Sequence, residues 1–176
     1  MTIPVDATLR QLDTWYRAVL GDGDKPALLC KLAMMELCGW LEQRMDVITR
    51  EAATCCGVGT SGELDLAIRD TFGFHYKKHF RPLIAVAIGE VGVVDAEGRF
   101  DAASPGDLEH LKSLLGTLWD LRSTLAHTTM ASPIPIQVTK YAPSWSLNQW
   151  KQLNRLLVAY EAAAKVTATK VKGALP

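Results

Sequence analysis

The sequence predicts an all-α protein, an up-and-down bundle of about five helices. Three stretches carry this prediction: residues 5–19, 26–54 and 108–118, in each of which apolar side chains recur every three or four positions. That spacing places the apolar side chains on one face of a helix. Glycine and proline fall between the periodic stretches, where helices end. We therefore expect little or no β-sheet.

Length and composition fit one soluble globular domain over residues 1–176. Hydrophobic residues make up 48% of the chain and charged residues 22%, which excludes wholesale disorder. The formal net charge is zero, so any affinity for RNA must come from a local basic surface. The first residues lack the basic and apolar regions of a secretory signal, and the apolar runs are too interrupted to span a bilayer. We expect a cytoplasmic protein with no membrane segment.

The first two helices are predicted from their apolar stripes. The stripe of the first helix consists of Val5, Leu9, Leu12, Tyr16 and Val19, and this helix ends ahead of a glycine-rich turn. The second opens at Pro26, because proline suits the first helical position, and ends before Cys55. It would extend about 40 Å, long enough to be the spine of the bundle. Its stripe is predicted to be Leu28, Leu32, Met35, Gly39, Glu42, Met45 and Ile48.

The middle of the chain is predicted to be less regular. A third helix begins at Ser61 and is weakened at Gly73. Pro82 should kink or restart it, which leaves a short fourth piece from Leu83 to Glu90. Three glycines occur in quick succession from there on, so residues 89–103 are expected to form a surface loop or a short hairpin.

Two further helices are predicted toward the C-terminus. Ser104 is the expected N-cap of the fifth helix, with a proline directly after it at the first helical position. The prolines within residues 133–138 predict an extended arm or edge segment. Ser146 and Gln149 are spaced as a capping box for the last helix, expected over residues 146–172 with a fraying tail. Its stripe comprises Trp150, Leu153, Leu157 and Tyr160.

Arg122 and His127 are the strongest candidates for chemistry. Arg122 takes the next place on the apolar stripe that Leu108, Leu111, Leu115 and Leu118 begin. A guanidinium cannot shed its charge, so at an inward-facing position it needs acidic or backbone acceptors, a wet cleft or an anionic ligand. One interpretation is structural, with Arg122 paired to a buried acid. The other is functional, because a permanent cation and a titratable imidazole lie five residues apart.

The placement of Arg122 and His127 near the end of a helix resembles the R-x4-6-H motif of the HEPN superfamily. Residues 28–42 look like the long second helix of RiboL-PSP-type HEPN domains, with Gly39 and Glu42 at the places of a small residue and an acid.

The resemblance covers residues 5–130 and implies a HEPN-like helical fold. It also implies a metal-independent endoribonuclease that acts as a homodimer and leaves a 2′,3′-cyclic phosphate and a 5′-hydroxyl. A role as a toxin or antiviral-defence effector is implied by the resemblance alone.

The residue types of the motif suit this reaction. Imidazole, with an ordinary pKa near 6.5, can act as general base or acid, and the planar guanidinium matches phosphate oxygens. On a continuous helix, however, an offset of five residues turns the two side chains about 140° apart. We therefore expect a second subunit to complete the site across a two-fold interface.

Four residues are supporting candidates. Asp120 and Thr128 can orient the guanidinium or the phosphate, although such residues are also ordinary caps or surface groups. Glu42 can pair with Arg122, either as a structural salt bridge or as support for the site. Ser123 follows Arg122 at a place where many HEPN members carry Asn, Asp or His.

The densest basic and aromatic cluster lies in residues 75–81. Its cations Lys77, Lys78 and Arg81 predict contacts with the RNA backbone. The alternative is a solvated helix face, since basic runs are commonly just solvent-facing.

No metal or cofactor is expected. Cys30, Cys38, Cys55 and Cys56 lack the spacing of zinc sites, which favours free thiols. The chain has no glycine-rich phosphate loop, H-E-x-x-H motif or serine nucleophile elbow, which removes the common nucleotide-binding, metalloprotease and hydrolase classes.

The leading hypothesis is a homodimeric HEPN-type ribonuclease whose substrate is RNA, with an antitoxin or regulatory protein as a further partner. Its dimer face is expected to be built from the second and fifth helices. Two alternatives stay open. One is a catalytically inactive HEPN-like module that binds nucleic acid or protein through the same cleft. The other is a helical dimerisation module in which Arg122 is only salt-bridged to Glu42.

Overall fold

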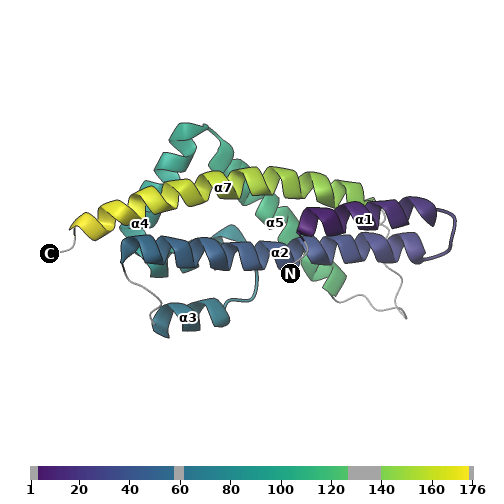
Figure 1. Cartoon of the computed structure of the whole chain (residues 1–176), viewed down its shortest axis with the longest axis horizontal. Helices are drawn as coiled ribbons and strands as arrows, with labels where there is room; N and C mark the ends of the chain where they lie inside the picture. The colour runs from purple at the N-terminus through teal and green to yellow at the C-terminus, as the bar shows by residue number, and fades with distance from the viewer. Residues whose placement is uncertain (1–3, 58–61, 127–139, 175–176) are drawn as a thin grey trace. The chain divides into compact units, whose positions relative to one another are not determined.

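The computed structural model describes residues 4–57, 62–126 and 140–174, and all regular structure in these ranges is helical (Figure 1). The prediction of an all-α protein is therefore confirmed. None of the described helices is both long and apolar enough to cross a membrane. The elements are α1 (Val5–Ala18), α2 (Lys25–Cys56), α3 (Gly62–Arg69), the π-helical turn η1 (Tyr76–Phe80), α4 (Arg81–Ala103), α5 (Asp107–Ala126) and α7 (Pro143–Ala174).

The chain divides into two compact units. The first unit comprises residues 1–41 and 117–152, and the second comprises residues 42–116 and 153–176. All three boundaries fall inside long helices, so α2, α5 and α7 each contribute to both units.

In the first unit, α1 lies alongside the first half of α2 (Figure 1). Leu9 and Leu12 of α1 are buried against Ala33 of α2. The first part of α7 joins this core through Leu147 and Trp150. Burial of such side chains contributes about 1.5–3 kcal/mol each, so this contact is what fixes α1 on α2.

The second unit is built around an aromatic core. Tyr160 of α7 lies with its ring centroid 5.2 Å from that of Phe80, 5.5 Å from Phe100 and 6.2 Å from Tyr76. The ring of Tyr76 also packs edge-on against Phe80. These tilted and T-shaped arrangements are the ones that aromatic quadrupoles prefer. They tie η1 and α4 to α7.

The loop or hairpin expected over residues 89–103 was a wrong prediction, because this segment is the second half of α4. The helix breaks only at Gly89, whose φ of 78° and ψ of 160° are non-helical. Beyond the break, Val93, Ala96 and Phe100 are buried at helical spacing. Gly92 is helical as well, and a Cβ there would lie 3.1 Å from the Ile88 side chain. That glycine therefore serves close packing, where the sequence suggested a turn.

The predicted apolar stripe of α2 was only partly correct. Met45 and Ile48 are buried, but Leu32 is 43% exposed. The buried positions of the first half are instead Cys30, Ala33, Met34, Leu37, Cys38 and Leu41. Because α2 is apolar around most of its circumference there, its sequence does not select one face. The packing of α1 decides which face is covered.

The predicted caps of the last two helices were also wrong. The fifth helix, α5, begins at Asp107, and the Asp101 carboxylate accepts hydrogen bonds from the backbone N–H groups of Gly106 (3.0 Å) and Leu108 (3.4 Å). The last helix, α7, begins at Pro143, so Ser146 is buried inside it.

The start of α7 receives its cap from another helix. The Asp13 carboxylate of α1 accepts the backbone N–H of Ser144 at 3.1 Å. At the other end, α7 is helical to Ala174, and Thr167 and Ala168 are buried. The arm predicted over residues 133–138 lies outside the described residues.

Candidate functional site

The C-terminal part of α5 carries Arg122. Leu111, Leu115 and Leu118 are fully buried along one stripe, as predicted. Arg122 takes the next position on that stripe and is half-buried. A charge at the edge of an apolar core keeps partial hydration, which avoids the large cost of complete burial.

The Arg122 guanidinium lies over the ring of Trp119, with its central carbon 5.4 Å from the ring centroid. The two residues are three positions apart, so they share one face of α5. A cation over an indole face gains about 0.5–2 kcal/mol, depending on how far it is desolvated. Trp119 was not among the predicted site residues, although its spacing from Arg122 was the signal that could have identified it.

Of the other residues predicted around Arg122 on α5, the structure describes Asp120 and Ser123. Asp120 is exposed and Ser123 is half-buried. The backbone carbonyl of Asp120 accepts the hydroxyl of Thr124 at 3.0 Å, which is an ordinary helix contact. His127 and Thr128 lie outside the described residues, so their geometry toward Arg122 stays a prediction.

Glu42 is a half-buried residue of α2. It belongs to the second unit and Arg122 to the first. The predicted pairing of these two side chains stays a prediction.

The basic cluster of residues 75–81 separates into two parts. Lys77 and Lys78 are exposed on η1. Arg81 instead forms ion pairs, with its Nη1 2.9 Å from Glu90 and its Nε 3.2 Å from Glu97. Lys77 and Lys78 form no ion pair with any residue that the structure describes, whereas two neighbouring acids match the charge of Arg81.

Beneath the lysines lies a buried hydroxyl network. The Tyr76 hydroxyl is 2.8 Å from Glu97 and 3.3 Å from the Tyr160 hydroxyl. Each hydroxyl has one hydrogen, so Tyr76 donates to Glu97 and Tyr160 donates to Tyr76. Burial raises the pKa of Tyr160 to about 12 and that of Tyr76 further. Both phenols stay protonated at neutral pH, so we assign this network a structural role.

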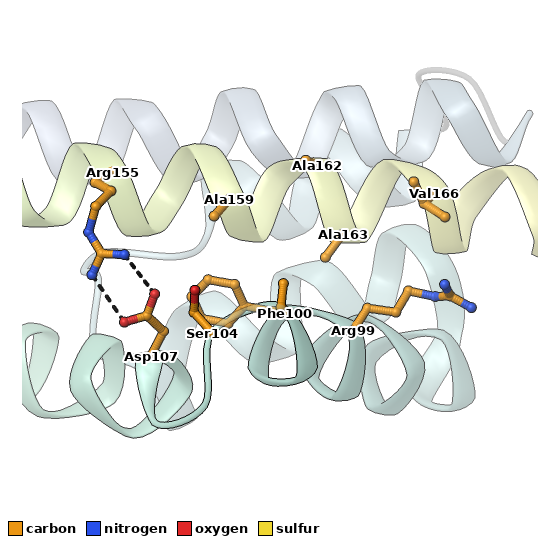
Figure 2. A pocket seen from close by; sticks show the side chains of 10 residues that line it. Arg99, Phe100, Ser104, Asp107, Arg155, Ala159, Ala162, Ala163 and Val166 are labelled. Carbon is orange, nitrogen blue, oxygen red and sulfur yellow. Dashed lines mark hydrogen bonds and ion pairs between the residues drawn. The ribbon is translucent and has the colours of Figure 1, made fainter.

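A groove of about 370 Å³ lies between α4 and α7 in the second unit (Figure 2). Its walls are apolar, and they consist of Phe100, Ala103, Ala159, Ala162, Ala163 and Val166. Arg155 stands at one end and is bound by both oxygens of Asp107, at 2.7 and 3.0 Å. Arg99 stands at the other end and is held by Asp95, at 2.6 and 3.3 Å. The charges of both arginines at the groove are thus matched by acids within the protein. No pattern in the sequence predicts this groove, because it forms only where two segments far apart in the chain meet.

Within the described residues, no three His, Cys, Asp or Glu side chains are grouped so that they could hold a metal ion. The side chains of Cys30, Cys38 and Cys56 are buried, and that of Cys55 is half-buried. Burial raises the pKa of Cys30 to about 11, so this thiol is un-ionised at neutral pH.

Comparisons of the chain with models of protein families, with curated proteins and with solved structures found no match.

Proposed function

We propose that this protein is a cytoplasmic, metal-independent endoribonuclease that acts as a homodimer, as a toxin or antiviral-defence effector. The observation that supports this proposal is the position of Arg122. It stands on the apolar stripe of α5, half-buried against Trp119, five residues before His127. The HEPN-like motif supplies the reaction, and the ring of Trp119 supplies a reason for the guanidinium to keep one orientation.

The proposed reaction needs no oxidant or cofactor. A base removes the proton of the ribose 2′-hydroxyl, the 2′-oxygen attacks phosphorus, and the 5′-oxygen leaves with a proton. His127 serves as the proton-transfer group and Arg122 stabilises the negative charge on the phosphorane oxygens. The products are a 2′,3′-cyclic phosphate and a 5′-hydroxyl.

Arg122 and His127 are expected to act across the subunit interface, because five residues of continuous helix would turn them about 140° apart. One protomer then contributes the guanidinium and its partner the imidazole. Light scattering should give the mass of a dimer at tens of micromolar protein. A monomer at that concentration would contradict the composite site.

The test is incubation of the purified full-length protein with single-stranded RNA in EDTA, followed by analysis of the product ends. The wild type should yield cyclic phosphate ends. Arg122→Ala and His127→Ala should each lower the cleavage rate by about 10²–10⁴-fold with helical content unchanged. His110→Ala is the matched control, because His110 is exposed on the same helix and should cleave like the wild type.

A separate experiment tests the RNA path. Lys77 and Lys78 are exposed cations, so Lys77→Ala with Lys78→Ala should weaken RNA binding. Each lost phosphate contact should lower the slope of log affinity against log salt by about 0.7 for single-stranded RNA. An unchanged slope would make this a solvated surface. Arg81 is left intact in this test because its ion pairs join Glu90 and Glu97.

The second candidate function is an inactive HEPN-like module that binds RNA or protein. Ser123 beside Arg122 favours it, because many active members carry Asn, Asp or His there. RNA binding that depends on Arg122, without cleavage by the wild type, would support this module. Loss of folding in Arg122→Ala with full activity in His127→Ala would instead support a structural arginine.

A further inference from the structure

A second groove, of about 380 Å³, lies in the first unit between α1 and the first half of α2, which run side by side in Figure 1. Ala7, Gln11 and Trp15 follow one another along α1 at intervals of four residues, and Leu32 and Glu36 do so along α2. Residues four apart share a helix face. The groove therefore runs along α1 for about two turns and along α2 for about one.

The groove exposes two large apolar side chains. Trp15 is 52% exposed and Leu32 is 43% exposed. Their exposure follows from how α1 packs, because Leu9 and Leu12 occupy the buried side of α1 against Ala33. Tryptophan is enriched among the residues that dominate binding energy, and exposed apolar patches commonly mark interaction sites.

The groove also holds an unmatched negative charge. The Glu36 carboxylate is exposed and forms no ion pair or hydrogen bond among the described residues. The arginines of α1 that lie next to the groove residues in sequence are Arg10 and Arg17. They do not pair with Glu36, because they form ion pairs with Asp6 at 3.8 Å and with Asp13 at 2.9 Å. In the α4–α7 groove, by contrast, both arginines are held by acids. Unlike the α4–α7 groove, the α1–α2 groove thus carries a charge that no described residue matches.

We propose that the α1–α2 groove binds a cationic amphipathic helix of another protein. An apolar side chain of that helix would insert between Trp15 and Leu32, and a Lys or Arg would pair with Glu36. A third helix laid into the groove between two others is a common mode of recognition, with anchors at helical spacing. The small side chain of Ala7 leaves room for the partner backbone at one end. A cation beside Trp15 would gain a further attraction from the indole face.

The probe is a displayed library of amphipathic helices about 18 residues long, roughly five turns, with randomised apolar and charged positions. It is selected on the full-length protein without counter-selection, so that dependence on Trp15 is tested afterwards. The enriched helices should share an apolar stripe and a Lys or Arg at one fixed position. Synthetic copies should lose about 30-fold in affinity with Trp15→Ala and about two- to fivefold with Glu36→Gln. Glu36→Lys should reverse the preference, so that a copy with Glu at the fixed position binds better than the cationic one.

Three outcomes would overturn the proposal. The first is that the selection yields no binders, or binders that retain their affinity for Trp15→Ala. The second is that the enriched helices carry no conserved cation and Glu36→Lys leaves the charge preference unchanged. The third is that the wild type self-associates in sedimentation while Trp15→Ala and Glu36→Lys are monomeric, which would make a second copy the occupant. Circular dichroism of each variant establishes that it is folded, and Arg17→Ala, exposed on the same helix, is the matched control that should bind like the wild type.

Discussion

At the scale of single residues, the buried hydroxyls of Tyr76 and Tyr160 contribute unequally to stability, because each has one hydrogen to donate and their acceptors differ. Tyr76 is 1% exposed and donates to the Glu97 carboxylate, whereas Tyr160 donates to the Tyr76 oxygen over a longer distance. A hydrogen bond to a charged acceptor is stronger than one between hydroxyls. The two phenols are therefore not equivalent, although both rings fill the same core.

We predict that Tyr76→Phe lowers the free energy of unfolding by about 1.5–3 kcal/mol, because Glu97 loses the shorter of its hydrogen bonds and keeps the one from Arg81. Tyr160→Phe should cost about 0.5–1.5 kcal/mol, since Tyr76 keeps its bond to Glu97. Urea unfolding at neutral pH measures both. Equal losses in the two variants would contradict the assigned direction of donation.

A second prediction at this scale concerns Trp119, and it rests on the proposed ribonuclease activity. If the indole orients the Arg122 guanidinium, Trp119→Leu should slow RNA cleavage by about two- to thirtyfold, the equivalent of one cation–π contact. Trp119→Phe should retain most of the rate. The pH profile should not move, because the proton-transfer group is untouched. A shifted pH profile would contradict a pure positioning role for Trp119.

At the scale of elements, α4 depends on one glycine at a break and contains others inside regular helix. Gly89 has φ of 78° and ψ of 160°, a region that is essentially restricted to glycine. Gly98 lies in helical backbone with open space where a Cβ would stand. The same substitution should therefore have opposite effects at these two positions.

We predict that Gly89→Ala destabilises the protein by about 1–3 kcal/mol, because alanine is strained in that backbone conformation. Gly98→Ala should stabilise it by about 0.5–1 kcal/mol, since alanine is the better helix former and restricts the unfolded chain. Thermal unfolding of both variants is the measurement. A stabilised Gly89→Ala would mean that α4 runs unbroken through this position.

At the scale of the whole molecule, α7 is tied to two other helices of the second unit by polar contacts. Arg44 of α2 forms an ion pair with Glu161, and Lys165 bridges Glu161 and Glu51. On α4, the Asp95 carboxylate accepts the Thr167 hydroxyl at 2.6 Å. Burial by itself raises the pKa of Glu161, but the hydrogen bond from Lys165 and the charges of Arg44 and Lys165 outweigh it and lower the pKa to about 2.

This network predicts a loss of stability in acid. The ordinary pKa of a glutamate is 4.5. The contribution of Glu161 to the free energy of unfolding is therefore complete above pH 4.5 and is lost as the pH falls toward 2. The unfolding free energy of Glu161→Gln should lie below that of the wild type at pH 7. The difference should shrink steadily between pH 4.5 and 2.

Glu63→Gln is the control for this acid titration, because Glu63 is exposed and forms no ion pair within the described ranges. Urea unfolding across that pH range compares the three proteins. A difference between Glu161→Gln and the wild type that does not change with pH would show that Glu161 contributes by packing alone.

The sequence by itself was enough to predict the helical class, the long second helix and the stripe of α5 that ends at Arg122. These features depend on periodicity within one segment, which local sequence encodes. The break at Gly89 was also signalled there, but its glycine-rich surroundings suggested a loop. The buried positions Val93, Ala96 and Phe100 show that packing against the rest of the unit overrode those local preferences.

Only the tertiary structure decided which distant side chains cap a helix or form an ion pair. The cap of α7 comes from Asp13, 131 residues away, and Arg81 forms ion pairs with Glu90 and Glu97. The exposure of Leu32 depends on where α1 lies, since α2 is apolar on more than one face. Such outcomes depend on contacts between segments far apart in the chain, and a pattern within one segment carries no information about which distant surface will cover it.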